Sequence, residues 1–312
     1  MLLLQVSHLT KTFTKGFWPF TQKQRQIVKG ISFEIKQGEI LGLLGANGAG
    51  KTTTIQMLLG TLTPTSGSIL YFGKEFNKHR SEILHKVSYT SGYDKLPARL
   101  TVFENLSIIG GLYNLSHAET MEQIESLLKF FGLWDIRHQE TGSLSAGQAT
   151  RMMLTKAFMP NPALVLLDEP TASLDPDIAH DVRQFLLKQT KERGTSLLLT
   201  SHNMDEVTEI CDRVLVLKNG IIVADNTPEQ LAAGVSLIRL HLIVTDRLQE
   251  LINYLDTHKI IYNLQLHQIK IALEEQNIAH FLSAIAERKI IYSHISIDKP
   301  TLADYFLSLS KE

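Results

Sequence analysis

Gly45-Ala46-Asn47-Gly48-Ala49-Gly50-Lys51-Thr52 is the stretch that decides the fold of this chain of 312 residues. It fits the phosphate-loop pattern GxxxxGK[ST], and it stands between a strand-like apolar segment, 40–44, and the start of an expected helix. Glycines let the backbone turn its N–H groups towards phosphate oxygens, and the helix N-terminus adds a favourable dipole. The pattern predicts nucleotide contacts from Gly45, Asn47, Gly48, Gly50, Lys51, Thr52 and Thr53.

A second candidate site is formed by Asp168 and Glu169, which follow the apolar strand expected over 163–167. A buried parallel strand carries Asp168 to the carboxyl edge of its sheet, where it and the Thr52 hydroxyl can hold Mg²⁺. Glu169 is the candidate general base, worth about 10²- to 10⁴-fold in rate, and Lys51 contacts the β- and γ-phosphates. Alone, the acidic pair could equally be a solvated turn, but beside the phosphate loop it indicates a P-loop nucleotidase.

The segment Leu144-Ser145-Ala146-Gly147-Gln148 stands some twenty residues before Asp168 and closely resembles the LSGGQ segment of ABC ATPases. In that family the segment is a helix N-terminus that binds the γ-phosphate of ATP held on the opposite subunit. Ser145, Gly147 and Gln148 are therefore expected to contact a nucleotide presented by a second chain, which suits an anion site that has no lysine of its own. A bare helix cap would explain Ser145 but not the whole string.

The resemblance extends over roughly residues 1–230. Ser173-Leu174-Asp175 is similar to the D-loop that bridges the two subunits, so Asp175 is expected at the nucleotide interface. The family's switch histidine falls on His202, which would hydrogen-bond the γ-phosphate. Phe13 matches the aromatic position that stacks on adenine. The resemblance implies hydrolysis in which Glu169 acts as base while Lys51, His202 and Mg²⁺ steady the transition-state charge.

Two positions depart from the family pattern. Ala146 replaces a glycine, a change that a helix tolerates well. Gly92 stands where the family has the Q-loop glutamine, and glycine has no side chain to ligate Mg²⁺ or orient water. We hypothesise that Ser91, Asp94 or a water takes its place, or that hydrolysis is slower than usual. Residues 93–112 are still expected to form the surface that grips a permease.

The apolar patterns predict an α/β fold with an N-terminal antiparallel β subdomain, in which 14–26 is a hairpin loop, and a helical subdomain over about 93–158. Strands 163–167 and 196–200, separated by a helix over 176–191, favour a parallel sheet. We expect an ABC ATPase domain over 1–233 and a small ferredoxin-like α+β domain over 234–312, read as βαββαβ, with a regulatory or dimer-stabilising role. The ending, 299–307, resembles that of ABC-2 and drug-resistance exporter ATPases and favours export.

Composition limits the partners and the compartment. Lys plus Arg (31) nearly equals Asp plus Glu (32), so the net charge of −1 does not favour nucleic acid as a partner. The single cysteine, Cys211, cannot form an internal disulfide, which favours the cytoplasm. No run of about 18 apolar residues occurs, so a role in membrane transport would need a partner. The resemblance to ABC ATPases implies what that partner is: we expect a peripheral protein on the cytoplasmic face of the membrane, bound to a separate permease and to a second ATPase subunit.

Two other readings compete with the transporter subunit. The first is a soluble ABC ATPase that acts on ribosomes or nucleic acid without a permease. Such proteins usually carry tandem cassettes or a long coiled coil, whereas this chain has one phosphate loop and no sustained heptads. The second is a non-catalytic regulatory cassette, which only Gly92 suggests.

Overall fold

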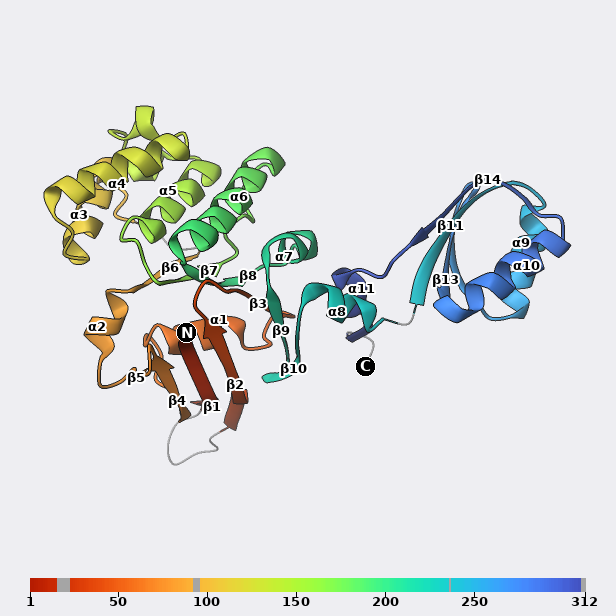
Figure 1. The fold of residues 1–312 in the computed structure, drawn as a ribbon, viewed down its shortest axis with the longest axis horizontal. Coiled ribbons are helices and arrows are strands. Elements are labelled where there is room, and N and C mark those ends of the chain that lie inside the picture. Colours follow the sequence, from red (N-terminus) through yellow and green to blue (C-terminus); the bar gives the residue numbers. More distant parts are fainter. Residues whose placement is uncertain (16–22, 92–95, 236, 310–312) are drawn as a thin grey trace. The chain divides into compact units, whose positions relative to one another are not determined.

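The computed structural model describes residues 1–15, 23–91, 96–235 and 237–309 (Figure 1). The chain forms two compact units, Met1–Thr227 and Pro228–Glu312. The sequence placed this boundary at 233/234. The division falls earlier because helix α8 (Pro228–Ala233) packs against the last helix, α11 (Leu302–Leu309), and so goes with the C-terminal unit.

A six-stranded sheet forms the centre of the first unit, in the order β10-β9-β3-β8-β7-β6. All strands are parallel except β10, which pairs antiparallel with β9. The bounds are β3 (Ile40–Gly45), β6 (Val87–Ser91), β7 (Leu164–Asp168), β8 (Ser196–Thr200), β9 (Arg213–Lys218) and β10 (Ile221–Asn226). The leucine-rich strands β7 and β8 are buried, as expected for a sheet covered on both faces. Parallel pairing brings the ends Gly45, Asp168 and Thr200 to one edge.

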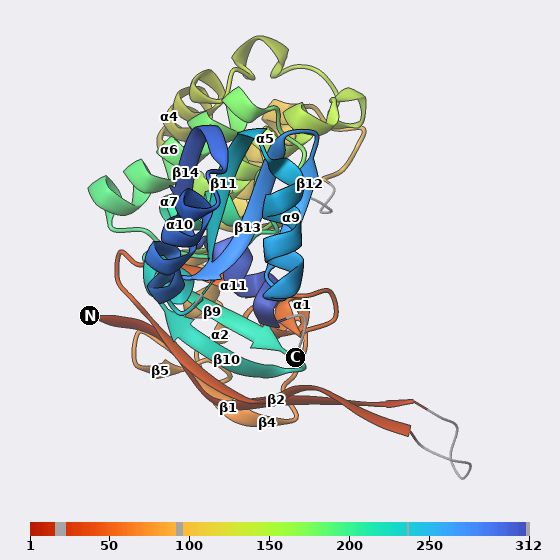
Figure 2. The same cartoon turned by 90° about the vertical axis from the view of Figure 1, so that its right-hand side faces the viewer.

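The antiparallel subdomain is a four-stranded sheet in the order β2-β1-β4-β5. Its strands are β1 (Leu2–Lys15), β2 (Lys23–Lys36), β4 (Ser66–Tyr71) and β5 (Lys74–Glu75). The hairpin loop predicted over 14–26 is too long, since Phe13 pairs with Arg25 and Thr12 with Gln26. Figure 2 shows both strands running on as a ribbon. The ends of β1 and β2 are paired by backbone hydrogen bonds and have no apolar face, so the apolar pattern of the sequence does not reveal that they are strands. The aromatic residues of the predicted loop, Phe17, Trp18 and Phe20, lie outside the described residues.

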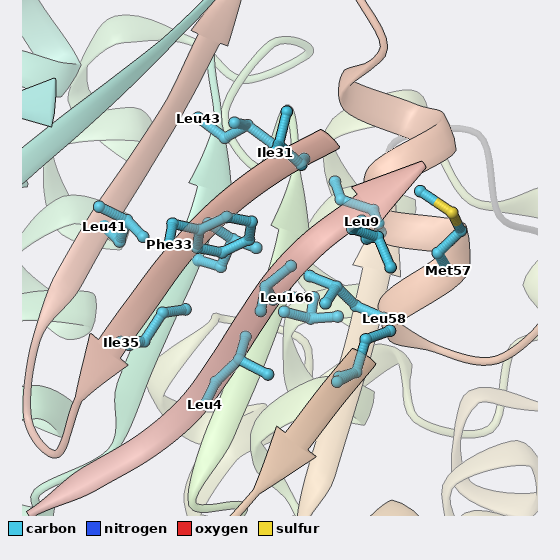
Figure 3. Packing of buried hydrophobic residues seen from close by; sticks show 14 of the residues in the cluster. Leu4, Leu9, Ile31, Phe33, Ile35, Leu41, Leu43, Met57, Leu58 and Leu166 are labelled. Atoms are coloured by element: carbon cyan, nitrogen blue, oxygen red, sulfur yellow. The ribbon is translucent and has the colours of Figure 1, made fainter. Parts of the chain in front are cut away.

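The main core fills the space between the two sheets and helix α1 (Lys51–Leu58) (Figure 3). Leu4 and Leu9 of β1 and Phe33 of β2 meet Leu43 of β3 and Leu58 of α1, and all five are buried. Each such side chain contributes about 1.5–3 kcal/mol by leaving water. This packing fixes both the strand that precedes the phosphate loop and the helix that follows it.

Helices are present within the segment predicted to be helical, about 93–158, and over the predicted helix 176–191. Two capping boxes, Thr101 with Glu104 and Ser116 with Glu119, begin α3 and α4. Phe131, Phe158 and Phe185 stack edge to face and join α4, α5 and α6. The helices are α2 (Arg80–Leu84), α3 (Val102–Leu112), α4 (His117–Phe130), α5 (Ala146–Phe158), α6 (Pro176–Arg193) and α7 (Met204–Ile210), with 3₁₀ turns η1 (Trp134–Ile136) and η2 (Thr141–Ser143).

The C-terminal unit has the predicted ferredoxin-like βαββαβ order with a sheet β12-β13-β11-β14, all pairs antiparallel. Leu240, Leu242 and Val244 of β11 are buried against α9 and α10. Leu266 lies in the turn between β12 and β13, where it is 90% exposed and has a φ of 57°. The elements are β11 (Leu237–Asp246), α9 (Leu248–Thr257), β12 (Ile261–Gln265), β13 (Gln268–Glu274), η3 (Glu275–Asn277), α10 (Ile278–Glu287) and β14 (Ile291–Asp298). None of the helices in the described parts of the chain is both long and apolar enough to span a membrane.

Candidate functional site

The phosphate loop lies between β3 and α1, where the motif predicted it. Gly50 precedes the helix with a φ of 112°, in the region that favours glycine. Gly45 approaches β9 so closely that an added Cβ would lie 2.4 Å from the carbonyl oxygen of Leu217. Since neither position accepts a side chain without moving the backbone, the loop conformation depends on these two glycines.

Lys51 places a buried ammonium inside the phosphate loop. Its Nζ donates to the carbonyl oxygens of Gly45, at 2.5 Å, and Ala46, at 3.5 Å. Burial lowers the pKa of Lys51, while the negative charges of Glu169 and Asp168 act in the opposite direction. Lys51 therefore lies between the loop and the two carboxylates. An anion that took the place of the Gly45 and Ala46 carbonyl oxygens would favour the charged form of the lysine.

A pocket of about 480 Å³ opens beside the loop. It brings Phe13 of β1 together with the phosphate loop, although they are far apart in the sequence. The Phe13 ring is 42% exposed, and Lys11 Nζ lies 5.2 Å from its centroid. The lining residues are Phe13, Arg25, Ile27, Ala46, Asn47, Gly48, Gly50, Lys51, Thr52 and Thr53. An aromatic ring at one end and a cationic loop at the other suit a flat base joined to phosphates.

Arg25 and Ile27 of β2 also line this pocket, although no sequence pattern marks them as site residues. Arg25 pairs directly with Phe13 across the β1–β2 ladder. Arg25 could have been found only as the residue opposite Phe13 on the neighbouring strand, and that requires the register of the hairpin to be known. The guanidinium adds a second positive charge to the pocket.

Asp168 ends β7 at the sheet edge and is anchored there by its neighbour strand. Thr200 Oγ1 of β8 donates to Asp168 Oδ1 at 2.5 Å, and the Glu169 N–H donates to the carbonyl oxygen of Thr200 at 3.1 Å. Ser91, at the end of β6, lies in register with Asp168 on its other side. Thr200 thus orients both acidic residues, a contribution that the strand pattern did not reveal.

Glu169 and His202 form the closest acid–base pair of the site. His202 Nε2 lies 3.2 Å from Glu169 Oε1, and the His202 N–H donates to Oε2, also at 3.2 Å. Burial raises the pKa of Glu169, and the nearby His202 opposes that shift. Glu169 also has a φ of 55°, an uncommon value for a residue other than glycine. A half-buried carboxylate of raised pKa can accept a proton from water.

Thr52 and Asp168 are the predicted metal ligands. Thr52 lines the pocket. Asp168 is close enough to influence the pKa of Lys51, the residue that precedes Thr52 in the phosphate loop. Within the described residues there is no cluster of three or more His, Cys, Asp or Glu side chains that could hold a metal. One carboxylate and one hydroxyl nevertheless fit Mg²⁺, which commonly takes its other ligands from phosphates and water.

The LSAGQ segment forms the start of α5 with a capping box. Ser145 Oγ accepts from the Gln148 N–H at 3.3 Å, and Gln148 Oε1 accepts from the Ser145 N–H at 2.9 Å. Arg151 anchors the helix by donating to the carbonyl oxygen of Phe131 at 2.7 Å. Ser145 is exposed. Judged on the described residues, no part of LSAGQ lines the pocket around Phe13 and Lys51.

The predicted D-loop lies next to LSAGQ rather than at the pocket. A Cβ added to Gly147 would lie 3.7 Å from the carbonyl oxygen of Ser173. Asp175 is the exposed N-cap residue of α6. The predicted site residues therefore fall into two groups. Phe13, the phosphate loop, Asp168, Glu169 and His202 form one, and Ser145, Gly147, Gln148 and Asp175 form the other.

Gly92 and Asp94 lie outside the described residues. Ser91, the other residue suggested as a substitute for the Q-loop glutamine, is buried beside Asp168. Ser91 is therefore the strand neighbour of the predicted metal ligand, and the hypothesis that it replaces the glutamine stays a prediction.

Sequence comparisons find transporter ATP-binding proteins. A family profile described as "ABC transporter" matches residues 28–172, and one described as "AAA domain, putative AbiEii toxin, Type IV TA system" matches 149–208. The chain is 30% identical to the linearmycin resistance ATP-binding protein LnrL of Bacillus subtilis, over 99% of this chain and 98% of that protein. It is 35% identical to the Nod factor export ATP-binding protein I of Cupriavidus metallidurans, over 66% of this chain and 67% of that protein.

Solved structures give the same fold. The ATP-binding subunit of an ABC transporter aligns with a TM-score of 0.66 and 28% identity, covering 74% of this chain and 92% of that one. The cbiO1 protein of Clostridium perfringens, described as part of the ABC transporter complex cbiONQ, aligns with a TM-score of 0.62 and 26% identity, covering 82% and 95%.

Proposed function

The chain belongs to the ABC transporter ATP-binding family, and from that premise we propose that two ATPase subunits close head to tail around two ATP molecules to drive a membrane permease. The chain is an ATP-binding subunit of an ABC transporter and has the ATPase activity of that family. The observation that carries the proposal is the division of the site residues into two groups on one chain. Because Ser145 and Gly147 lie away from the pocket around Lys51, each pocket needs the LSAGQ segment of a second subunit.

Nucleotide binding in this proposal uses the pocket from end to end. The adenine ring stacks on Phe13, on the ring face opposite the Lys11 ammonium. The triphosphate lies in the loop with Lys51 and the backbone N–H groups. Arg25 adds a charged hydrogen-bond donor at the pocket wall. A pocket of about 480 Å³ has room for a nucleotide.

Thr52 and Asp168 are the residues that would hold Mg²⁺. When bound, the ion would neutralise part of the negative charge of the phosphates. Thr200 supports this arrangement because its hydrogen bond keeps the Asp168 carboxylate at the end of β7. Ser91 lies on the other side of the same carboxylate.

Glu169 is the proposed general base, and His202 and Lys51 stabilise the charge that develops on the γ-phosphate. The raised pKa of Glu169 suits a base, since a carboxylate that is poorly solvated accepts a proton more readily. His202 Nε2 lies 3.2 Å from the same carboxylate, so the general base and the histidine that binds the γ-phosphate are neighbours. The positive charge of Lys51 then favours phosphate binding and stabilises the negative charge that develops on the phosphate oxygens.

We propose that the chain binds a separate permease and a second ATPase subunit, and that it lies peripherally on the cytoplasmic face of the membrane. The names of the relatives, one of a resistance protein and one of an export protein, support export rather than uptake. The exposed apolar side chains of Ile108 and Leu112 on α3 suit the surface that contacts the permease. The family relationship does not favour action on ribosomes or nucleic acid. The C-terminal unit is proposed to regulate or stabilise the dimer.

Steady-state phosphate release tests the proposed roles. We expect the unaltered protein to hydrolyse Mg-ATP and the Glu169→Gln variant to bind ATP with unchanged affinity while its kcat falls by about 10²- to 10⁴-fold. Asp177→Asn, a change of a neighbouring exposed acid in α6, serves as the matched control and should keep full activity. Rapid hydrolysis by Glu169→Gln would contradict the role of Glu169, and no hydrolysis by the unaltered protein would favour a regulatory cassette.

A further inference from the structure

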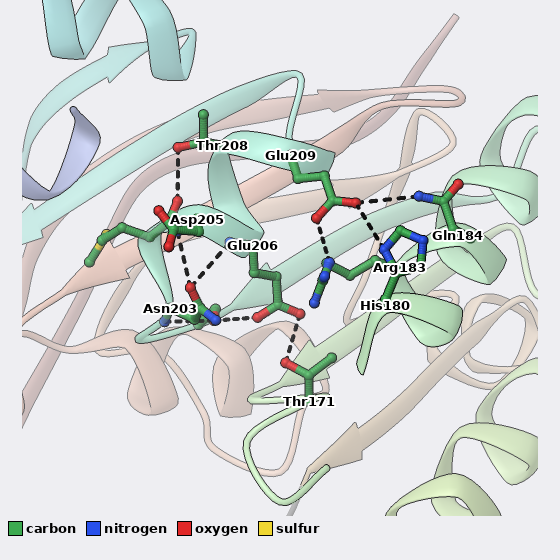
Figure 4. Close-up of polar contacts among 11 residues, drawn as sticks. Thr171, His180, Arg183, Gln184, Asn203, Asp205, Glu206, Thr208 and Glu209 are labelled. Carbon is green, nitrogen blue, oxygen red and sulfur yellow. Dashed lines mark hydrogen bonds and ion pairs between the residues drawn. The ribbon is translucent and has the colours of Figure 1, made fainter. Parts of the chain in front are cut away.

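The loops that follow β7 and β8 are joined by one buried carboxylate, that of Glu206 on α7 (Figure 4). Thr171 Oγ1 donates to Glu206 Oε1 at 2.8 Å, and Ser201 Oγ donates to Glu206 Oε2 at 2.5 Å. Glu206 is only 1% exposed, and both hydroxyl residues are buried. A carboxylate so far from water needs donors from the protein, so these two hydrogen bonds are required rather than optional.

Both hydroxyl residues are immediate neighbours of the proposed chemistry. Ser201 directly precedes His202, and Thr171 follows Glu169 by two residues. The Thr171 segment is a tight turn, in which the Ala172 N–H donates to the carbonyl oxygen of Glu169 and the Leu174 N–H donates to that of Thr171. A displacement of Thr171 would therefore be transmitted to Glu169 and to the D-loop at the same time.

The position of Glu206 itself is fixed by its helix. Asn203 begins α7, and its Oδ1 accepts from the N–H groups of Asp205 and Glu206 at 3.0 and 3.3 Å. The Asn203 N–H in turn donates to Ser201 Oγ at 3.0 Å. Backbone, helix cap and carboxylate thus form one connected network that ends at the residue before His202.

We infer that Glu206 is a positioning residue for hydrolysis: its carboxylate holds the loop of Glu169 and the loop of His202 in one fixed relation. The inference rests on the proposed roles of those two residues. The 3.2 Å distance between Glu169 Oε1 and His202 Nε2 spans two separate loops, and the Glu206 network joins both of them through hydroxyl groups one or two residues away. Glu206 does not contact the nucleotide pocket among the residues that are described, so its effect falls on turnover rather than on ATP binding.

The test uses substitutions that keep side-chain volume. Thr171→Val removes the hydroxyl donor but preserves the shape, whereas Thr171→Ser keeps the donor. Glu206→Gln keeps the shape of the acceptor and removes its charge. Glu209→Gln is the matched control, because Glu209 lies on the same helix and accepts from Arg183 and Gln184 at the surface.

We expect Thr171→Val and Glu206→Gln to lower kcat by about tenfold to hundredfold, while the Kd for ATP changes by less than about twofold. Thr171→Ser and Glu209→Gln should keep the kcat of the unaltered protein. The inference is overturned if folded Thr171→Val hydrolyses ATP at the normal rate, or if kcat and ATP affinity fall together as in a general loss of structure. Should Glu206→Gln fail to fold, Thr171→Val and Thr171→Ser decide the question. Failure of the unaltered protein to release phosphate would instead contradict the proposed function, and this inference with it.

Discussion

Removal of the Phe13 ring should weaken nucleotide binding by about 5- to 30-fold. Stacking of a base on an aromatic side chain contributes about 1–3 kcal/mol. Because the ring is 42% exposed in an open pocket, we take the lower part of this range, about 1–2 kcal/mol, and convert it at 1.4 kcal/mol per tenfold change in Kd. The contact of Lys11 with the ring exists before the nucleotide binds, so its loss changes stability more than affinity.

Titration calorimetry of ADP binding measures this effect without interference from hydrolysis. Phe13→Tyr retains an aromatic face and is expected to bind ADP with nearly the affinity of the unaltered protein. Inorganic tripolyphosphate provides a ligand without a base, and its affinity should be the same for Phe13→Ala and the unaltered protein. An unchanged Kd for ADP in Phe13→Ala, or an equal loss for tripolyphosphate, would refute the assignment of the ring to the base.

Three further outcomes follow from the geometry. Because burial raises the pKa of Glu169 and the base must be ionised, kcat should fall on the acid side at a higher pH than for an exposed glutamate; an acid limb in the ordinary glutamate range in a pH–rate profile would contradict this. Gly45→Ala should lower the free energy of unfolding by an overpacking cost of about 1–3 kcal/mol and weaken ATP binding. Gly48→Ala strains the backbone at a φ of 80° but has nothing within 4 Å of its added Cβ, so it should bind ATP more tightly than Gly45→Ala in a titration, and equal affinities would contradict this. Leu242→Ala should destabilise the C-terminal unit by about 2–5 kcal/mol in denaturant unfolding and leave ATP affinity unchanged. A loss of ATP-binding free energy as large as this destabilisation would argue against a separate core in the C-terminal unit.

The sequence predicted those parts of the site whose chemistry is local. The phosphate loop needs only eight consecutive residues, and the end of β7 is visible as an apolar run that stops at Asp168. The βαββαβ order of the C-terminal unit was predictable for the same reason, since it depends on short-range spacing. The family resemblance then supplied Phe13 and His202, which no local pattern singles out.

The missed residues depend on contacts between distant segments. Arg25 is a charged residue in a polar stretch, and only the register of β1 and β2 places it opposite Phe13. Thr200 appears as the last residue of an apolar strand, and its bond to Asp168 follows from strand order. Glu206 has the appearance of a solvated acid in the first turn of a helix, yet its partners, Thr171 and Ser201, come from two loops and stand thirty residues apart in sequence.

Assembly of the Glu169→Gln protein with saturating Mg-ATP tests the shared nucleotide site most directly. Light scattering after size-exclusion chromatography should show a dimer with ATP and a monomer without it, since the variant binds but does not consume the nucleotide that joins the subunits. Gly147→Asp in the same background is the matched control. Its Cβ has only ordinary contacts, at 3.7 Å or more, while the added charge opposes the partner's γ-phosphate and should prevent dimer formation without loss of ATP binding. A Glu169→Gln protein that stays monomeric with bound Mg-ATP would contradict the account.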